Sequence, residues 1–152
     1  MIQEEKQLLL QDLCARLPYG IMVDRLGVPH KVLSIKTGSI EIDRGKYMPA
    51  SYYLDEVKPY LRPMSSMTAE ERKEFSKLLD RRCCEEDWEG HISISYCIEI
   101  DNVYTDDEDG IKYPTPFSMA AIDWLNARHF DYRGLIEKGL AIEAPEGMYY
   151  SV

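Results

Sequence analysis

The sequence predicts an α+β fold, mainly because its hydrophobic period changes along the chain. Residues 2–17 repeat apolar side chains at helical spacing and are followed by Pro18, which ends a helix. Between residues 19 and 57, short alternating segments are separated by turn residues such as Thr37-Gly38 and Arg44-Gly45. We therefore expect an N-terminal helix followed by a small, curled antiparallel sheet or an SH3-like barrel.

The second half of the chain predicts a helix and then a long strand. Thr68 followed by Glu71 has the spacing of a capping box, which predicts a helix from Ala69 to about Cys84. Strict alternation from Ile92 to Ile100 predicts a half-buried strand. This strand either extends the first sheet or pairs with a short strand at Leu140–Ile142.

The C-terminal quarter predicts a helical hairpin. Ser118 stands at the N-cap position of the first helix, and Asp131 can cap a second helix at Tyr132–Lys138, with Gly139 as its left-handed stop. Trp124 lies off the apolar stripe of the first helix. It therefore either packs under a neighbouring loop or presents its indole to a partner.

A proline- and serine-containing stretch at Leu61–Met67 is the natural boundary within the chain. We expect a helix-and-sheet lobe at residues 1–62 and an acidic α+β lobe at residues 63–152, or one compact domain that contains both. The chain has 152 residues, 45% of them hydrophobic, which is enough for a core.

The sequence also favours a cytoplasmic protein. No apolar run approaches the ~20 residues of a membrane span, and the N-terminus lacks the pattern of a secretion signal. We therefore expect no membrane contact. The four cysteines are expected to be reduced thiols, because two of them are adjacent and nothing indicates secretion. They are Cys14, Cys83, Cys84 and Cys97.

The formal net charge of −9 is unevenly distributed. Residues 80–109 hold eleven acids against two arginines, so this window alone supplies the whole net charge. An acidic face can bind a basic partner, although acidic residues also serve solubility. The candidate partner-binding residues are Asp106, Asp107, Glu108, Asp109 and Trp124.

Familiar catalytic and metal-binding motifs are absent from the sequence, and we expect no cofactor, no metal and no catalytic residue. With Gly110 as the sixth residue of a calcium loop, Pro116 occupies the twelfth position, where a bidentate glutamate is needed. This favours a solvated loop over a weak divalent-ion site. A small enzyme with an unrecognised site is an alternative, and a pocket joining a histidine to Asp123, Asp131 or Glu137 would support it.

Three segments together resemble a family of small proteins without an assigned activity, from gut Bacteroidales and their phages or mobile elements. They are Leu8–Gly20, Asp55–Thr68 and Trp124–Met148. The resemblance implies an origin and no mechanism.

These observations lead to the hypothesis of a non-enzymatic accessory protein of a phage or mobile element that binds an unknown protein partner. A specific version is an acidic inhibitor that mimics DNA and blocks a nucleic-acid-binding protein. The overall acidity argues against direct nucleic-acid binding. The basic and aromatic residues that would be needed for it cluster in the first half: Arg25, Lys31, Lys36, Arg44 and Lys46, with Tyr47, Tyr52 and Tyr53.

Overall fold

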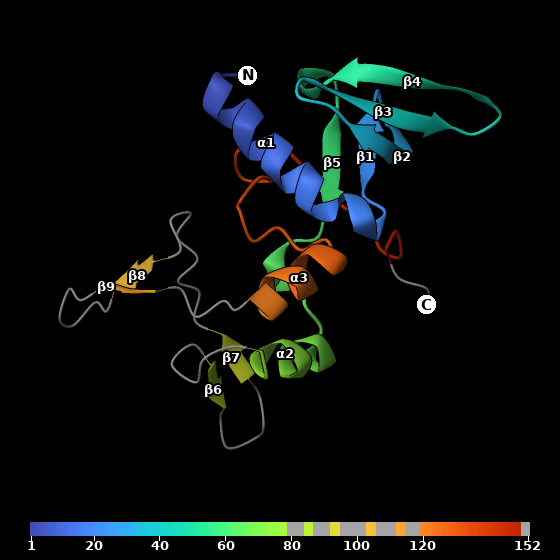
Figure 1. Ribbon diagram of the computed structural model, residues 1–152. Coiled ribbons are helices and arrows are strands. Elements are labelled where there is room, and N and C mark those ends of the chain that lie inside the picture. Colours follow the sequence, from blue (N-terminus) through green and yellow to red (C-terminus); the bar gives the residue numbers. More distant parts are fainter. Residues whose placement is uncertain (79–83, 87–91, 95–102, 106–111, 115–118, 150–152) are drawn as a thin grey trace. The chain divides into compact units, whose positions relative to one another are not determined.

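The structure is a computed structural model that describes residues 1–78, 84–86, 92–94, 103–105, 112–114 and 119–149 (Figure 1). Its helices and mixed sheet confirm the predicted α+β class. The chain divides into two compact units. The first combines Met1–Pro63 with Asn126–Val152, and the second is Met64–Leu125.

The first unit begins with helix α1 (Gln3–Arg16), as the N-terminal pattern predicts. The backbone N–H of Ile2 donates to the Glu5 carboxylate at 3.0 Å, which satisfies one of the free donors at the helix start. At the other end, Pro18 lies in a short 3₁₀ turn, η1 (Leu17–Tyr19), and Gly20 follows with a φ of 76°. The left-handed glycine turns the chain into the sheet.

Six strands form the sheet of the first unit, in the order β10-β5-β1-β2-β3-β4. Strands β1 to β4 form an antiparallel meander, and β5 is antiparallel to β1. Strand β10 is parallel to β5, so the sheet is mixed rather than purely antiparallel as expected. The bounds are β1 (Met22–Arg25), β2 (Val28–Ile35), β3 (Ser39–Arg44), β4 (Tyr47–Tyr53), β5 (Lys58–Leu61) and β10 (Ile142–Glu143).

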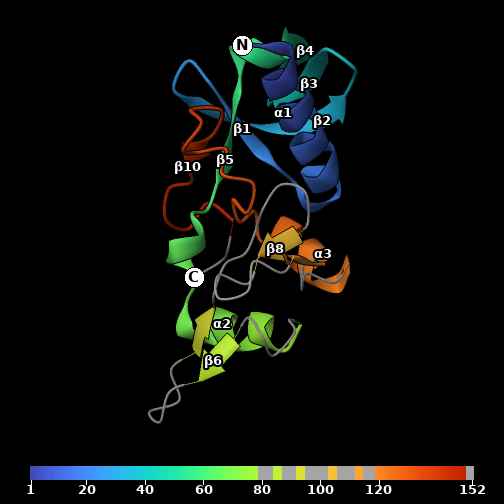
Figure 2. The same cartoon turned by 90° about the vertical axis from the view of Figure 1, so that its left-hand side faces the viewer.

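Helix α1 packs on this sheet through one continuous core (Figures 1 and 2). Within the meander, Val32 lies opposite Ile42, and Ile42 lies opposite Ala50, so alternate residues of three strands share the inner face. The C-terminal segment adds its own side chains to this core, and residues 126–149 therefore return to the first unit. The core residues are Leu9, Leu13, Ile21, Val23, Val32, Ile40, Ile42, Leu54, Val57, Leu61, Leu135, Leu140 and Ala141.

The prediction of a C-terminal helical hairpin is wrong for the second helix. Helix α3 (Met119–Ala127) forms, but residues 132–138 make hydrogen-bonded turns. The Asp131 carboxylate does cap this segment, since it accepts from the N–H groups of Leu135 at 2.8 Å and Ile136 at 2.9 Å. Gly134 then adopts a φ of 72°, which interrupts a right-handed helix. The predicted left-handed stop at Gly139 is confirmed by its φ of 72°.

The second unit starts with the predicted capping box. Thr68 Oγ accepts from Glu71 N–H and the Glu71 carboxylate accepts from Thr68 N–H, both at 3.1 Å. Helix α2 (Ala69–Ser76) is shorter than expected, and it ends where the Ser76 hydroxyl donates to the Lys73 carbonyl at 2.8 Å. A serine hydroxyl that binds a backbone carbonyl competes with continuation of a helix.

Short antiparallel hairpins complete the second unit. Strand β7 (Ile92–Ile94) pairs with β6 (Cys84–Glu86), so this part of the predicted long strand joins neither the first sheet nor Leu140–Ile142. The rest of that predicted strand, residues 95–100, lies outside the described residues. Strands β8 (Val103–Thr105) and β9 (Lys112–Pro114) form a second pair. A 3₁₀ turn, η3 (Met64–Ser66), precedes α2.

Candidate functional site

Of the predicted partner-binding residues, the structure places only Trp124. Its side chain is 8% exposed and stacks on Phe75 of the same unit, with ring centroids 5.1 Å apart and planes at 22°. The indole therefore packs against α2 rather than standing free on its helix. Asp106, Asp107, Glu108 and Asp109 lie outside the described residues.

Of the groups that the enzyme alternative could use, His129 and Asp131 are bound to backbone groups in the first unit. His129 is buried, its Nε2 lies 3.1 Å from the Tyr19 carbonyl, and its ring lies 3.9 Å from that of Tyr149. Burial, with help from the Arg16 charge, lowers the pKa of His129 to about 4. The neutral ring donates from Nε2, because a carbonyl only accepts. The Asp131 carboxylate accepts from the backbone N–H groups of Leu135 and Ile136.

The structure shows a buried ion pair at the end of α1, between Asp12 and Arg16, that was not predicted from the sequence. Arg16 donates to both carboxylate oxygens of Asp12, at 2.8 and 3.0 Å, and to the Phe130 carbonyl at 2.6 Å. Both charged side chains are fully buried, and Arg133 lies 3.9 Å from the same carboxylate. The i, i+4 spacing of Asp12 and Arg16, beside buried Leu9 and Leu13, was the available signal. The pair ties α1 to the returning C-terminal segment.

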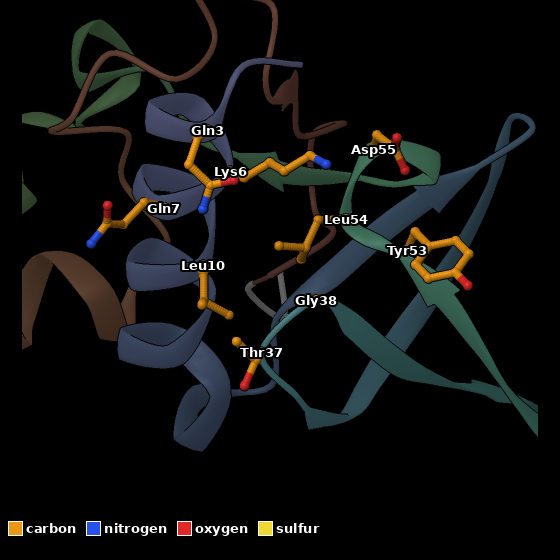
Figure 3. Close-up of a pocket in the computed structure, with 9 residues that line it drawn as sticks. All are labelled: Gln3, Lys6, Gln7, Leu10, Thr37, Gly38, Tyr53, Leu54 and Asp55. Atoms are coloured by element: carbon orange, nitrogen blue, oxygen red, sulfur yellow. The ribbon is translucent and has the colours of Figure 1, made fainter.

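A groove of about 440 Å³ lies between α1 and the end of the meander (Figure 3). One wall is α1, and the opposite wall is the β2–β3 turn together with a 3₁₀ turn, η2 (Leu54–Glu56). The volume lies within the roughly 300–1,000 Å³ range of small-ligand sites. The lining residues are Gln3, Lys6, Gln7, Leu10, Thr37, Gly38, Tyr53, Leu54 and Asp55.

The sequence of α1 explains why a groove forms there. Gln3, Lys6, Gln7 and Leu10 are spaced i, i+3, i+4 and i+7, so they share one face of the helix. Three polar residues on this face cannot pack on the sheet as Leu9 and Leu13 do. Leu10, on the same face, lies across the groove from buried Leu54 (Figure 3).

Basic side chains of the meander lie over aromatic rings. The Arg25 guanidinium lies 3.9 Å from the Tyr52 ring centroid, and Arg44 and Lys46 lie 5.7 and 5.5 Å from that of Tyr47. These cation–π contacts pair several of the basic and aromatic residues that the sequence brings together. The Arg25 contact joins β1 to β4, and the contacts of Arg44 and Lys46 lie at the β3–β4 turn.

The described residues contain neither a cluster of metal ligands nor a membrane-spanning helix. In the part of the chain that the structure describes, no three histidine, cysteine or acidic residues gather to hold a metal ion. Within the same residues, no helix is long and apolar enough to cross a membrane. Comparison with protein-family models, with curated proteins and with solved structures gave no match.

Proposed function

We propose that the chain is a non-enzymatic accessory protein of a phage or mobile element, and that its second unit binds a basic protein partner. One observation supports this above all: the two units divide the charge completely. The first unit contains twelve basic and twelve acidic residues, whereas the second contains six basic and fifteen acidic residues. The full net charge of −9 thus belongs to one compact unit.

A unit with a large excess of one sign attracts partners of the opposite sign and speeds their association. The neutral first unit, with its continuous core, serves in this proposal as the stable scaffold. A basic partner that normally binds DNA would meet carboxylates in place of phosphates, which is the DNA-mimic version of the proposal. Direct binding of the acidic unit to nucleic acid is opposed by like-charge repulsion.

The test is affinity capture from a lysate of a gut Bacteroidales strain at low and high salt, with mass spectrometry of the bound proteins. Four acids are neutralised together in one variant, Asp106→Asn, Asp107→Asn, Glu108→Gln and Asp109→Asn. We expect a basic partner that is captured by the wild type, lost at high salt and weakened in the variant.

A matched control removes the same number of charges from the first unit. The exposed acids Glu4, Glu137, Glu143 and Glu146 are changed to glutamine, and capture should persist. Equal loss in both variants would show a response to net charge alone and contradict a specific acidic surface. For the DNA-mimic version, duplex DNA should displace the purified partner in competition.

A further inference from the structure

The groove between α1 and η2 has an apolar floor. Leu54 is buried and points toward α1, and Leu10 faces it from the helix (Figure 3). Tyr53 also lines the groove and is 69% exposed, and its ring points away from α1 (Figure 3). An apolar floor of this kind offers a place for one aliphatic side chain of a ligand.

Opposite charges flank this floor without meeting each other. Lys6 extends from α1 toward η2, where Asp55 lies on the opposite wall (Figure 3). Within the described residues, Lys6 and Asp55 form no ion pair, and the side chains of Gln3, Gln7 and Thr37 make no hydrogen bond. The polar lining of the groove is therefore available to a ligand.

Unlike Lys6 and Asp55, the adjacent residues Glu5 and Glu56 use their carboxylates to bind backbone N–H groups. Glu5, next to Lys6, accepts from the Ile2 N–H at 3.0 Å. Glu56, next to Asp55, accepts from the Tyr53 N–H at 2.8 Å. The two glutamates therefore cap the first turns of α1 and η2, and the side chains of Lys6 and Asp55 are not needed for capping.

From this arrangement we propose that the groove binds a small zwitterion of the α-amino-acid class with an aliphatic side chain. The ligand carboxylate pairs with the Lys6 ammonium group, and its ammonium group pairs with the Asp55 carboxylate. The side chain covers Leu10 and Leu54. This site lies within the first unit and does not depend on the acidic second unit.

The experiment is an NMR titration of the full-length ¹⁵N-labelled protein with leucine, N-acetyl-leucine, leucinamide and glycine. We expect saturable shifts with leucine at the amides of Gln7, Thr37 and Gly38. N-acetyl-leucine lacks the ammonium group and leucinamide lacks the carboxylate, so each should bind about tenfold more weakly, as expected for loss of one charge-assisted contact. Glycine should also bind more weakly, because it has no side chain to cover the floor.

Variants of the two charged residues make the assignment specific. In Asp55→Asn, acetylation of the ligand should cause no further loss, and in Lys6→Gln, amidation should cause none. Glu4→Gln and Lys138→Gln each remove one exposed charge outside the groove lining and should leave leucine binding unchanged. The proposal fails if leucine at concentrations up to about 10 mM gives no saturable shifts of the groove amides, because a specific site for a small ligand is occupied in this range. It fails equally if acetylation, amidation and the groove variants have no effect.

Discussion

Leu26 occupies a backbone conformation that leucine rarely adopts. It lies in the two-residue turn between β1 and β2, with a φ of 54°, and Gly27 follows at 81°. Turns with two positive φ values favour asparagine and glycine, because a branched side chain crowds the backbone there. The Leu26 side chain is 87% exposed, so no burial offsets this strain.

We predict that Leu26→Asn stabilises the first unit. Asparagine tolerates the left-handed region, and relief of the strain should raise the free energy of unfolding by about 1 kcal/mol. Urea denaturation of both proteins measures the difference. Leu33→Asn is the control, because Leu33 is also exposed but does not have a positive φ. Equal stabilisation by both substitutions, or none by Leu26→Asn, would contradict the explanation.

His129 has a similar positive φ, but its side-chain contacts offset the backbone strain. Its φ is 59°, yet its side chain is buried, bonded to the Tyr19 carbonyl and packed on Tyr149. These contacts offset the strain that remains uncompensated at Leu26. A positive φ is therefore strained at exposed Leu26 and compensated at buried His129, and the surroundings of the side chain make the difference.

At the level of elements, the Asp12–Arg16 pair decides how α1 is anchored. Two buried charges are costly to remove from water, and the pair is stable only because each charge has its partner. Arg16 also donates to Phe130 O, so it joins the first helix to a segment more than 100 residues away in the chain. Removal of one charge of the pair should therefore destabilise the fold more than removal of both charges.

We predict that Arg16→Met lowers the free energy of unfolding by about 3–5 kcal/mol, because Asp12 then remains buried without its main partner. The double variant Asp12→Leu, Arg16→Met should be clearly more stable than Arg16→Met. Urea denaturation of the wild type, both single variants and the double variant gives the coupling energy. Additive losses in the double variant would show that the two charges do not act as a pair.

At the level of the whole molecule, the first unit is assembled from the two ends of the chain. Strand β10 is parallel to β5, and the Tyr149 hydroxyl donates to the Tyr60 carbonyl at 2.7 Å and accepts from Met22 N–H at 3.1 Å. Burial accordingly raises the pKa of Tyr149. The N-terminal sheet thus depends on contacts with a segment that lies far along the chain.

We predict that a chain ending at Leu125 does not fold its first unit. It lacks buried Phe130, Leu135, Leu140 and Ala141. Burial of three large side chains contributes about 5–9 kcal/mol, which is comparable to the total stability of a domain. Circular dichroism should show no cooperative unfolding of the N-terminal helix and sheet. A chain ending at Tyr149 keeps these residues and should unfold cooperatively, and the same behaviour in the shorter chain would contradict the prediction.

The sequence by itself determined the elements whose signals are local. The α1 face of Leu9 and Leu13, the Thr68–Glu71 capping box and the left-handed stop at Gly139 were all readable, because each depends on residues within a turn or two. The position of the acidic window was also readable, since charge needs no fold. Helix length and the second C-terminal helix were not, because a serine hydroxyl and a positive φ at Gly134 outweighed the apolar period there.

Only the tertiary structure decided which distant segments meet. The parallel pairing of β10 with β5, the hydrogen bond from Arg16 to the Phe130 carbonyl and the groove beside Gln3 and Lys6 join residues far apart in the chain. Such contacts depend on how whole surfaces fit together, and a local pattern is compatible with many of them. The groove proposed as a binding site follows from polar residues on a helix face that this packing turns toward the sheet.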